Sequence, residues 1–145
     1  MVRRLGSSAA EWYGTILPRI HQWAPTQTVL KIVPGFGRWT QYLKDLARHL
    51  IVIDLTEECI TACRKRFAGA SNISYFVNDG RSLQGVDDTS VDAIFSFDSL
   101  VHVEFDVIEG YLPHFEALCH QAGLQRRSRE IIPWAPVFCR TAYLS

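Results

Sequence analysis

The stretch from Val29 to Thr40 constrains the fold of this chain more than any other. It reads VLKIVPGFGRWT: a short apolar run, a Pro-Gly-x-Gly turn, and then the start of a helical pattern. The run is typical of a buried parallel strand, and the turn is typical of a tight loop at a helix N-terminus. Glycine reaches positive φ, and a helix start offers unpaired N–H groups to an anion. Alone, the stretch fits an ordinary strand-to-helix turn and a ligand-binding loop equally well.

The composition indicates a single globular domain. The chain has 145 residues, 48% of them hydrophobic, and its formal net charge is zero. It is long enough to bury a core, too apolar for a disordered class, and without a global basic field that would point to nucleic acid. No apolar stretch approaches membrane-spanning length, and no signal peptide precedes the first helix. We therefore expect a cytoplasmic protein.

The cysteines and histidines do not indicate a metal site. Cys59 and Cys63 lie four residues apart on an expected helix, and Cys119 and Cys139 lie far from them, so there is no Cys-x-x-Cys pair. We expect buried free thiols in a reducing compartment in preference to a disulfide. The five histidines lack metal-ligand spacing with one another or with the cysteines.

Strand-like and helix-like segments alternate along most of the chain. Proline is expected to interrupt two of the helices, at Pro18 and Pro113. Thr56 is a suitable N-cap for the helix that follows it. The alternation predicts an α/β fold, a parallel sheet with helices on both faces. The expected strands are 28–33, 49–54, 73–77 and 91–97, and the expected helices are 9–21, 38–48, 57–66 and 104–121.

The last part of the chain breaks this alternation. Residues 125–130 read QRRSRE, a basic cluster that we expect to be a solvated face in preference to an RNA contact. Residues 137–144 are a weak candidate for one more strand. We divide the chain into a core over 1–123 and an atypical tail over 124–145. Such a tail fits a truncated or frame-shifted product as well as a divergent native one.

The candidate site lies where the expected strands end, because ligands of open parallel sheets bind outside the carboxyl ends of the strands. Asp54 ends the second strand, where a carboxylate can accept hydrogen bonds from ribose hydroxyls. A dinucleotide site would need a third glycine where Thr40 stands, so a nicotinamide-dependent oxidoreductase is the weaker alternative. The groups at the four strand ends are Pro34-Gly35-Phe36-Gly37, Asp54, Asp79-Gly80 and Ser96-Phe97-Asp98.

The ordered motifs IVPGFGRWT, VIDL, NDG and FSFDSL resemble those of class I S-adenosylmethionine-dependent methyltransferases. The resemblance covers about residues 10–112. It implies a Rossmann-like sheet with strand order 3-2-1-4, extended in complete domains by a fifth strand, and S-adenosylmethionine as cofactor. The implied cofactor contacts are the loop Pro34, Gly35, Phe36 and Gly37 under the methionine part, Asp54 at the ribose, Leu55, Asp79 and Gly80 at the adenine, and Ser96 and Phe97 near the sulfonium.

The resemblance also implies a reaction. Methyl transfer from a sulfonium is an in-line displacement, so alignment of the reacting atoms supplies much of the rate. A general base helps only where the acceptor must lose a proton, and Asp98 and His102 are the candidates. We expect a small-molecule methyl acceptor, which the sequence does not identify.

Two positions depart from the family pattern. Domains of this family usually carry an acidic residue where Lys31 stands and a glycine where Val33 stands. Two like charges about 5 Å apart at an effective dielectric of about 20 repel by roughly 3 kcal/mol, so Lys31 would weaken binding of the cofactor's ammonium unless it swings away. Val33 is β-branched and tolerates unusual φ poorly.

These departures support a second hypothesis, a degenerate or truncated domain without turnover. If the fifth strand is missing, the edge of the fourth strand is unpaired, which favours dimerisation.

Overall fold

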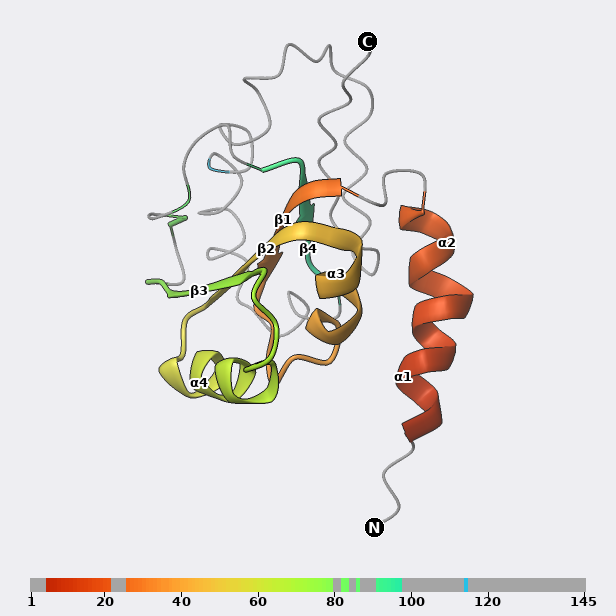
Figure 1. Ribbon diagram of the computed structural model, residues 1–145, viewed down its shortest axis with the longest axis horizontal. Helices are drawn as coiled ribbons and strands as arrows, with labels where there is room; N and C mark the ends of the chain where they lie inside the picture. Colours follow the sequence, from red (N-terminus) through yellow and green to blue (C-terminus); the bar gives the residue numbers. More distant parts are fainter. Residues whose placement is uncertain are drawn as a thin grey trace, which may run out of the picture.

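The computed structural model describes residues 5–21, 26–79, 82, 83, 86, 91–97 and 114. Within these residues the chain forms a parallel sheet of four strands in the order β3-β2-β1-β4, which confirms the predicted order (Figure 1). The strands are β1 (Thr26–Ile32), β2 (Ala47–Asp54), β3 (Ile73–Val77) and β4 (Ala93–Phe95).

The central strand β1 has a partner on each side. Lys31 of β1 lies opposite Val52 of β2 and opposite Phe95 of β4. Asp54, the last residue of β2, lies opposite Val77 of β3. Because all the pairs are parallel, the carboxyl ends of the four strands lie at the same edge of the sheet, where ligands of open α/β sheets bind.

The expected lead helix is continuous but changes its geometry along its length. It consists of α1 (Leu5–Glu11), a π-helical turn η1 (Trp12–Ile16) and α2 (Leu17–Ile20). The amide of Leu17 donates to the carbonyl of Trp12, five residues back. Pro18 has no amide hydrogen and its ring crowds the preceding turn, so a widened turn lets the helix continue through it. The predicted interruption at Pro18 is therefore a change of helix type.

The two later helices are α3 (Thr40–Leu46) and α4 (Glu57–Arg66). The prediction for α4 is confirmed, whereas α3 is shorter than the predicted 38–48. β2 begins directly after α3, because Ala47 already pairs with Thr26 of β1. β4 is likewise shorter than the predicted 91–97. Of the predicted helix over 104–121 the structure describes only His114, and the predicted strand over 137–144 and the tail over 124–145 lie outside the described residues.

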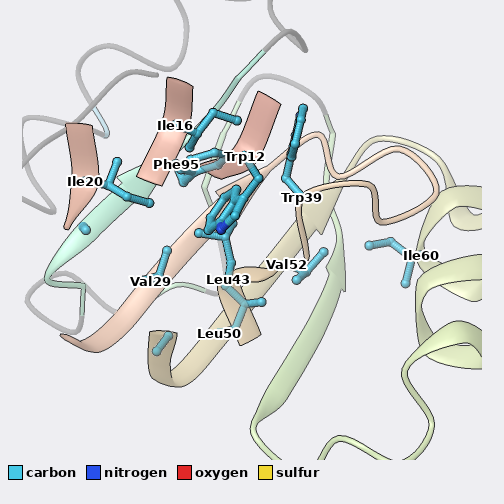
Figure 2. Close-up of a cluster of buried hydrophobic side chains, with 12 residues drawn as sticks. Trp12, Ile16, Ile20, Val29, Trp39, Leu43, Leu50, Val52, Ile60 and Phe95 are labelled. Carbon is cyan, nitrogen blue, oxygen red and sulfur yellow. The ribbon is translucent and has the colours of Figure 1, made fainter. Parts of the chain in front are cut away.

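The core has one hydrophobic cluster on each face of the sheet. The described helices pack on the first face, where Figure 2 shows Trp12 among Phe95, Leu43 and Val29. The ring of Trp12 stacks on that of Tyr42 at a centroid distance of 4.8 Å. The second face is covered in part by residues of the segment after β3. The hydrophobic cluster on this face consists of Leu30, Ile32, Ile51, Ile53, Leu83, Val86, Val91 and Ile94.

No helix among the described residues is long and apolar enough to cross a membrane. The same part of the chain holds no group of three or more His, Cys, Asp or Glu side chains that could bind a metal ion. Cys59 and Cys63 are free thiols; Cys63 is buried as expected, whereas Cys59 is only half-buried, and Cys119 and Cys139 lie outside the described ranges.

We expect Trp12→Ala to lower the free energy of unfolding by about 3–5 kcal/mol, because it leaves a cavity between the lead helix and the sheet. Tyr13 is the matched control, since it is 61% exposed on the same helical turn. Tyr13→Ala is expected to change stability by about 1 kcal/mol or less. Urea denaturation measures both. Equal losses in the two variants would contradict the packing of the lead helix on this face.

Candidate functional site

The loop from β1 to α3 contains three residues in the left-handed region. Gly35 has φ 54° and Gly37 has φ 87°, as the Pro-Gly-x-Gly pattern predicts. Val33 has φ 49°, although its side chain is β-branched. A valine there costs on the order of 1–3 kcal/mol, and it persists only where neighbouring contacts hold it. One such contact is the hydrogen bond from the Val33 amide to the carbonyl of Ile53, at 3.0 Å.

The carbonyl groups of the loop all accept hydrogen bonds from the chain itself. Lys31 Nζ donates to the carbonyls of Ile32 and Val33. The remaining donors are the amide of Gly37 to Pro34, Cys63 Sγ to Gly35, Arg66 Nη1 to Phe36, the amide of Gln41 to Gly37, and Gln41 Nε2 to Arg38. Side chains of β1, α3 and α4 therefore hold the loop in place through its carbonyl groups.

The amides of Gly35 and Phe36 remain available. Neither donates a hydrogen bond within the part of the chain that the structure describes. Successive amides next to residues in the left-handed conformation form concave sites that bind anions. A Cβ built on Gly35 would meet nothing within 4 Å, so the main chain there is open to a ligand. The geometry suits a carboxylate.

Gly37 has a different role. A Cβ at this position would lie 2.6 Å from Cε2 of Phe67, which packs against the loop from the residue after α4. The glycine thus permits close packing between the loop and the end of α4. Phe36, between the two glycines, is 61% exposed, and Pro34 is buried at the start of the turn.

Asp54 is nearly buried at the end of β2, with only 6% of its surface exposed. Its Oδ1 accepts hydrogen bonds from the amide and the hydroxyl of Thr56, each at 2.9 Å. Oδ2 accepts none from the described residues. Thr56 does stand at the N-cap, but its hydroxyl orients Asp54 instead of capping α4, a correction to its predicted role. Leu55, between them, is exposed.

The loop after β3 is built around Asp79. Its Oδ1 accepts from the amide of Ser82 at 2.7 Å and from the Ser82 hydroxyl at 3.0 Å, the pattern of a turn-forming aspartate. The amide of the preceding residue, Asn78, donates to the carbonyl of Asp54 at 2.9 Å. The ends of β2 and β3 are thus tied together. Gly80 lies outside the described residues.

Two predicted residues follow β4. Ser96 is 3% exposed, and its Oγ has no hydrogen-bond partner among the residues described. An orphaned buried hydroxyl is costly, so it is a candidate for a ligand contact. The ring of Phe97 packs edge-to-face on Trp39 at 5.6 Å. The candidate bases Asp98 and His102 lie outside the described residues and stay predictions.

Lys31 is completely buried beneath this loop. Its Nζ donates to the carbonyl of Ile32 at 2.7 Å and to that of Val33 at 3.1 Å, and lies 5.5 Å from the ring centre of Phe95. Burial lowers the pKa of Lys31 from 10.5 to about 7, and the nearby Asp54 carboxylate opposes part of this shift. The idea that Lys31 could swing away is wrong, because its amine is held by two carbonyls within the core.

Sequence reasoning missed the side chains that α4 contributes. Cys63 and Arg66 bond the carbonyls of Gly35 and Phe36, at 3.4 and 2.9 Å. No signal in the loop motif identifies these donors, because they come from an element about 30 residues further along the chain.

Comparison with known proteins gives a family match over most of the candidate site. A family model described as "Methyltransferase domain" matches residues 29–123, more than half of the chain. A curated relative, protein-L-isoaspartate O-methyltransferase 1 of Polaromonas sp., is 38% identical over 58 residues, which are 39% of this chain and 25% of that protein. The chain thus spans about a quarter of the length of the curated relative that it matches.

Solved structures share the fold. The PH0226 protein of Pyrococcus horikoshii matches with a TM-score of 0.64 and 21% identity, over 80% of this chain and 54% of that one. The DhpI–SAM–HEP complex matches with a TM-score of 0.59 and 24% identity, over 79% of this chain and 50% of that one. At these identities the likeness concerns the fold.

We expect Gly37→Ala to lower the free energy of unfolding by about 2–3 kcal/mol, because the new Cβ meets the Phe67 ring and the residue has positive φ. Gly35→Ala is the control, with positive φ but open space, and should cost about 1 kcal/mol. Thermal or urea unfolding compares them. Adding Phe67→Leu should recover part of the loss in Gly37→Ala alone; no recovery would contradict the contact.

The stability of the protein should rise with pH above about 7. In this range the unfolded chain keeps the Lys31 proton while the folded chain releases it, so the free energy of unfolding increases with pH. We expect a gain of about 2 kcal/mol between about pH 7 and about pH 9, relative to Lys31→Met. Urea denaturation at several pH values measures this. If the free energy of unfolding changes with pH in the same way in both proteins, the result would contradict the lowered pKa of the buried Lys31 amine.

Proposed function

Because this chain belongs to the methyltransferase domain family, we propose that it binds S-adenosylmethionine at the carboxyl edge of its sheet and transfers the methyl group to a small-molecule acceptor. One observation carries the proposal: the amides of Gly35 and Phe36 and Oδ2 of Asp54, which bond to none of the described residues, lie at the ends of two neighbouring parallel strands. The family match also favours methyl transfer over the nicotinamide-dependent alternative.

The residues of the site fit most parts of this cofactor. The amides of Gly35 and Phe36 would hold the carboxylate of its methionine part, since neither donates to a described residue and the space at Gly35 is open. Oδ2 of Asp54 would accept hydrogen bonds from the ribose hydroxyls, while Thr56 fixes the carboxylate through Oδ1. The exposed side chain of Leu55 offers an apolar surface for the adenine.

Asp79 and Ser96 would complete the contacts. With its Oδ1 held by Ser82, Asp79 shapes the loop that would border the adenine, together with the predicted contact at Gly80. The orphaned Oγ of Ser96 and the ring of Phe97 would lie near the sulfur. The part that does not fit is the ammonium group, because the charged form of Lys31 opposes it.

The main contribution of the protein to this reaction would be to align the reacting atoms. When bound, the cofactor supplies an electrophilic methyl group on a sulfonium, which is transferred in line to a nucleophile. The chain would hold the methionine carboxylate through the Gly35 and Phe36 amides and the ribose through Asp54, and the Trp39–Phe97 pair would contribute apolar surface beside β4. Asp98 and His102 stay the proposed bases for an acceptor that must lose a proton.

The class of acceptor is the finer part of the proposal. The net charge of zero provides no field for a nucleic acid, which supports a small molecule. The free thiols Cys59 and Cys63 support a reducing compartment such as the cytoplasm. A domain that binds the cofactor without turnover is the second candidate, favoured by the buried Lys31 and the positive φ of Val33.

Calorimetric titration with S-adenosylhomocysteine tests the proposal. We expect saturable binding, weakened by about tenfold or more in Asp54→Ala, because a charged acceptor for the ribose is lost. Asp45→Ala is the control, since this carboxylate is 69% exposed on α3 and pairs only with the neighbouring Lys44 among described residues. No detectable heat at millimolar ligand, with the protein shown to be folded, would contradict the proposed function.

A further inference from the structure

The two carbonyl groups at the end of β1 are already occupied by an amine of the chain. Lys31 Nζ lies 2.7 Å from the carbonyl oxygen of Ile32 and 3.1 Å from that of Val33. The side chain is 0% exposed, so the amine has no route to solvent. It is fixed at the start of the loop whose Gly35 and Phe36 amides donate no hydrogen bond to the described residues.

This arrangement matters for a ligand that carries an amino-acid group. In an α-amino acid the ammonium is attached to the carbon that bears the carboxylate. A carboxylate held by the amides of Gly35 and Phe36 therefore brings the ammonium to the same loop. An ammonium needs acceptors, but each carbonyl from Ile32 to Arg38 already accepts a hydrogen bond from the chain, so an ammonium would have to compete for its second lone pair. The charged form of Lys31 also repels a second cation.

We propose that Lys31 is a specificity-determining residue of this site, which takes up the carbonyls of Ile32 and Val33 and so favours adenosine thioethers with a carboxylate but no α-ammonium over the zwitterionic ligand. The inference rests on the proposed function, because it concerns ligands of the same site. The resemblance of the strand-end motifs to the family does not predict this ligand preference.

The surroundings of Lys31 make the preference dependent on pH. The groups that face the amine are the Asp54 carboxylate from β2, the Cys63 thiol from α4 and the apolar ring of Phe95 from β4. Burial raises the pKa of the Cys63 thiol to about 11, so this thiol stays neutral in the working range. Burial lowers the pKa of Lys31 to about 7. Lys31 is therefore mostly charged near pH 6 and mostly neutral near pH 8, and the repulsion weakens between them.

The experiment compares two probes that differ in one group. One is S-adenosylhomocysteine, and the other is its deamino analogue, in which hydrogen replaces the α-ammonium. Dissociation constants for both are measured by calorimetry on the whole chain, near pH 6 and near pH 8. The ratio of the two constants is taken within each variant, so a loss of folded protein affects both probes equally.

For the unchanged chain we expect the deamino analogue to bind about tenfold or more tightly than S-adenosylhomocysteine near pH 6, and the difference to shrink near pH 8. Lys31→Met removes the charge and both hydrogen bonds that the amine donates to the carbonyls of Ile32 and Val33, so the preference should disappear or reverse, with no dependence on pH. Lys31→Gln, a second neutral variant, should also lose it if Lys31→Met does not fold. Lys65→Met, on the exposed face of α4, should keep the preference.

The possible results separate the two proposals. Equal or tighter binding of S-adenosylhomocysteine to the unchanged chain near pH 6 would overturn the role of Lys31 while leaving the proposed function standing. A ratio that is the same in Lys31→Met or Lys31→Gln as in the unchanged chain would do so too. Binding of neither probe to any folded variant would overturn the proposed function, and this inference with it.

Discussion

The parallel pairing of β1 with a strand on each side is the constraint on which the rest of the structure depends. It brings the residues after β1, β2 and β4 to one edge of the sheet. It also buries both faces of β1, with Val29 in one cluster and Leu30 and Ile32 in the other. A strand buried on both faces reads as a continuous apolar run, so Lys31 is the exception that the fold must accommodate.

The fold accommodates Lys31 by using its amine. A buried lysine without acceptors would be strongly unfavourable, and here two backbone carbonyls and the nearby Asp54 reduce that cost. The same hydrogen bonds flank Val33, whose positive φ needs support. Lys31 and Val33, which look like two separate departures in the sequence, are therefore parts of one arrangement at the end of β1.

The loop is rigidified by residues that lie outside its motif. Cys63 and Arg66 of α4 and Gln41 of α3 bind loop carbonyls, while Phe67 packs against Gly37. These residues hold the loop carbonyls, whereas the amides of Gly35 and Phe36 donate to none of the described residues. The packing of α4 against the loop thus occupies the carbonyls of Gly35 and Phe36 and leaves their amides as available donors, which favours the anionic end of a ligand.

The sequence by itself determined the parallel sheet and the positions of Asp54 and the glycine loop, because apolar runs and turn residues are local signals. The strand order was predicted only through the resemblance to the methyltransferase family, and the structure confirms it. It misplaced the ends of α3 and β4, where strand pairing decides the boundary. Only the tertiary structure decided that Thr56 orients Asp54, that α4 holds the loop, and that Lys31 is locked inside with a lowered pKa. These features depend on burial and on contacts between distant elements, which no local pattern encodes.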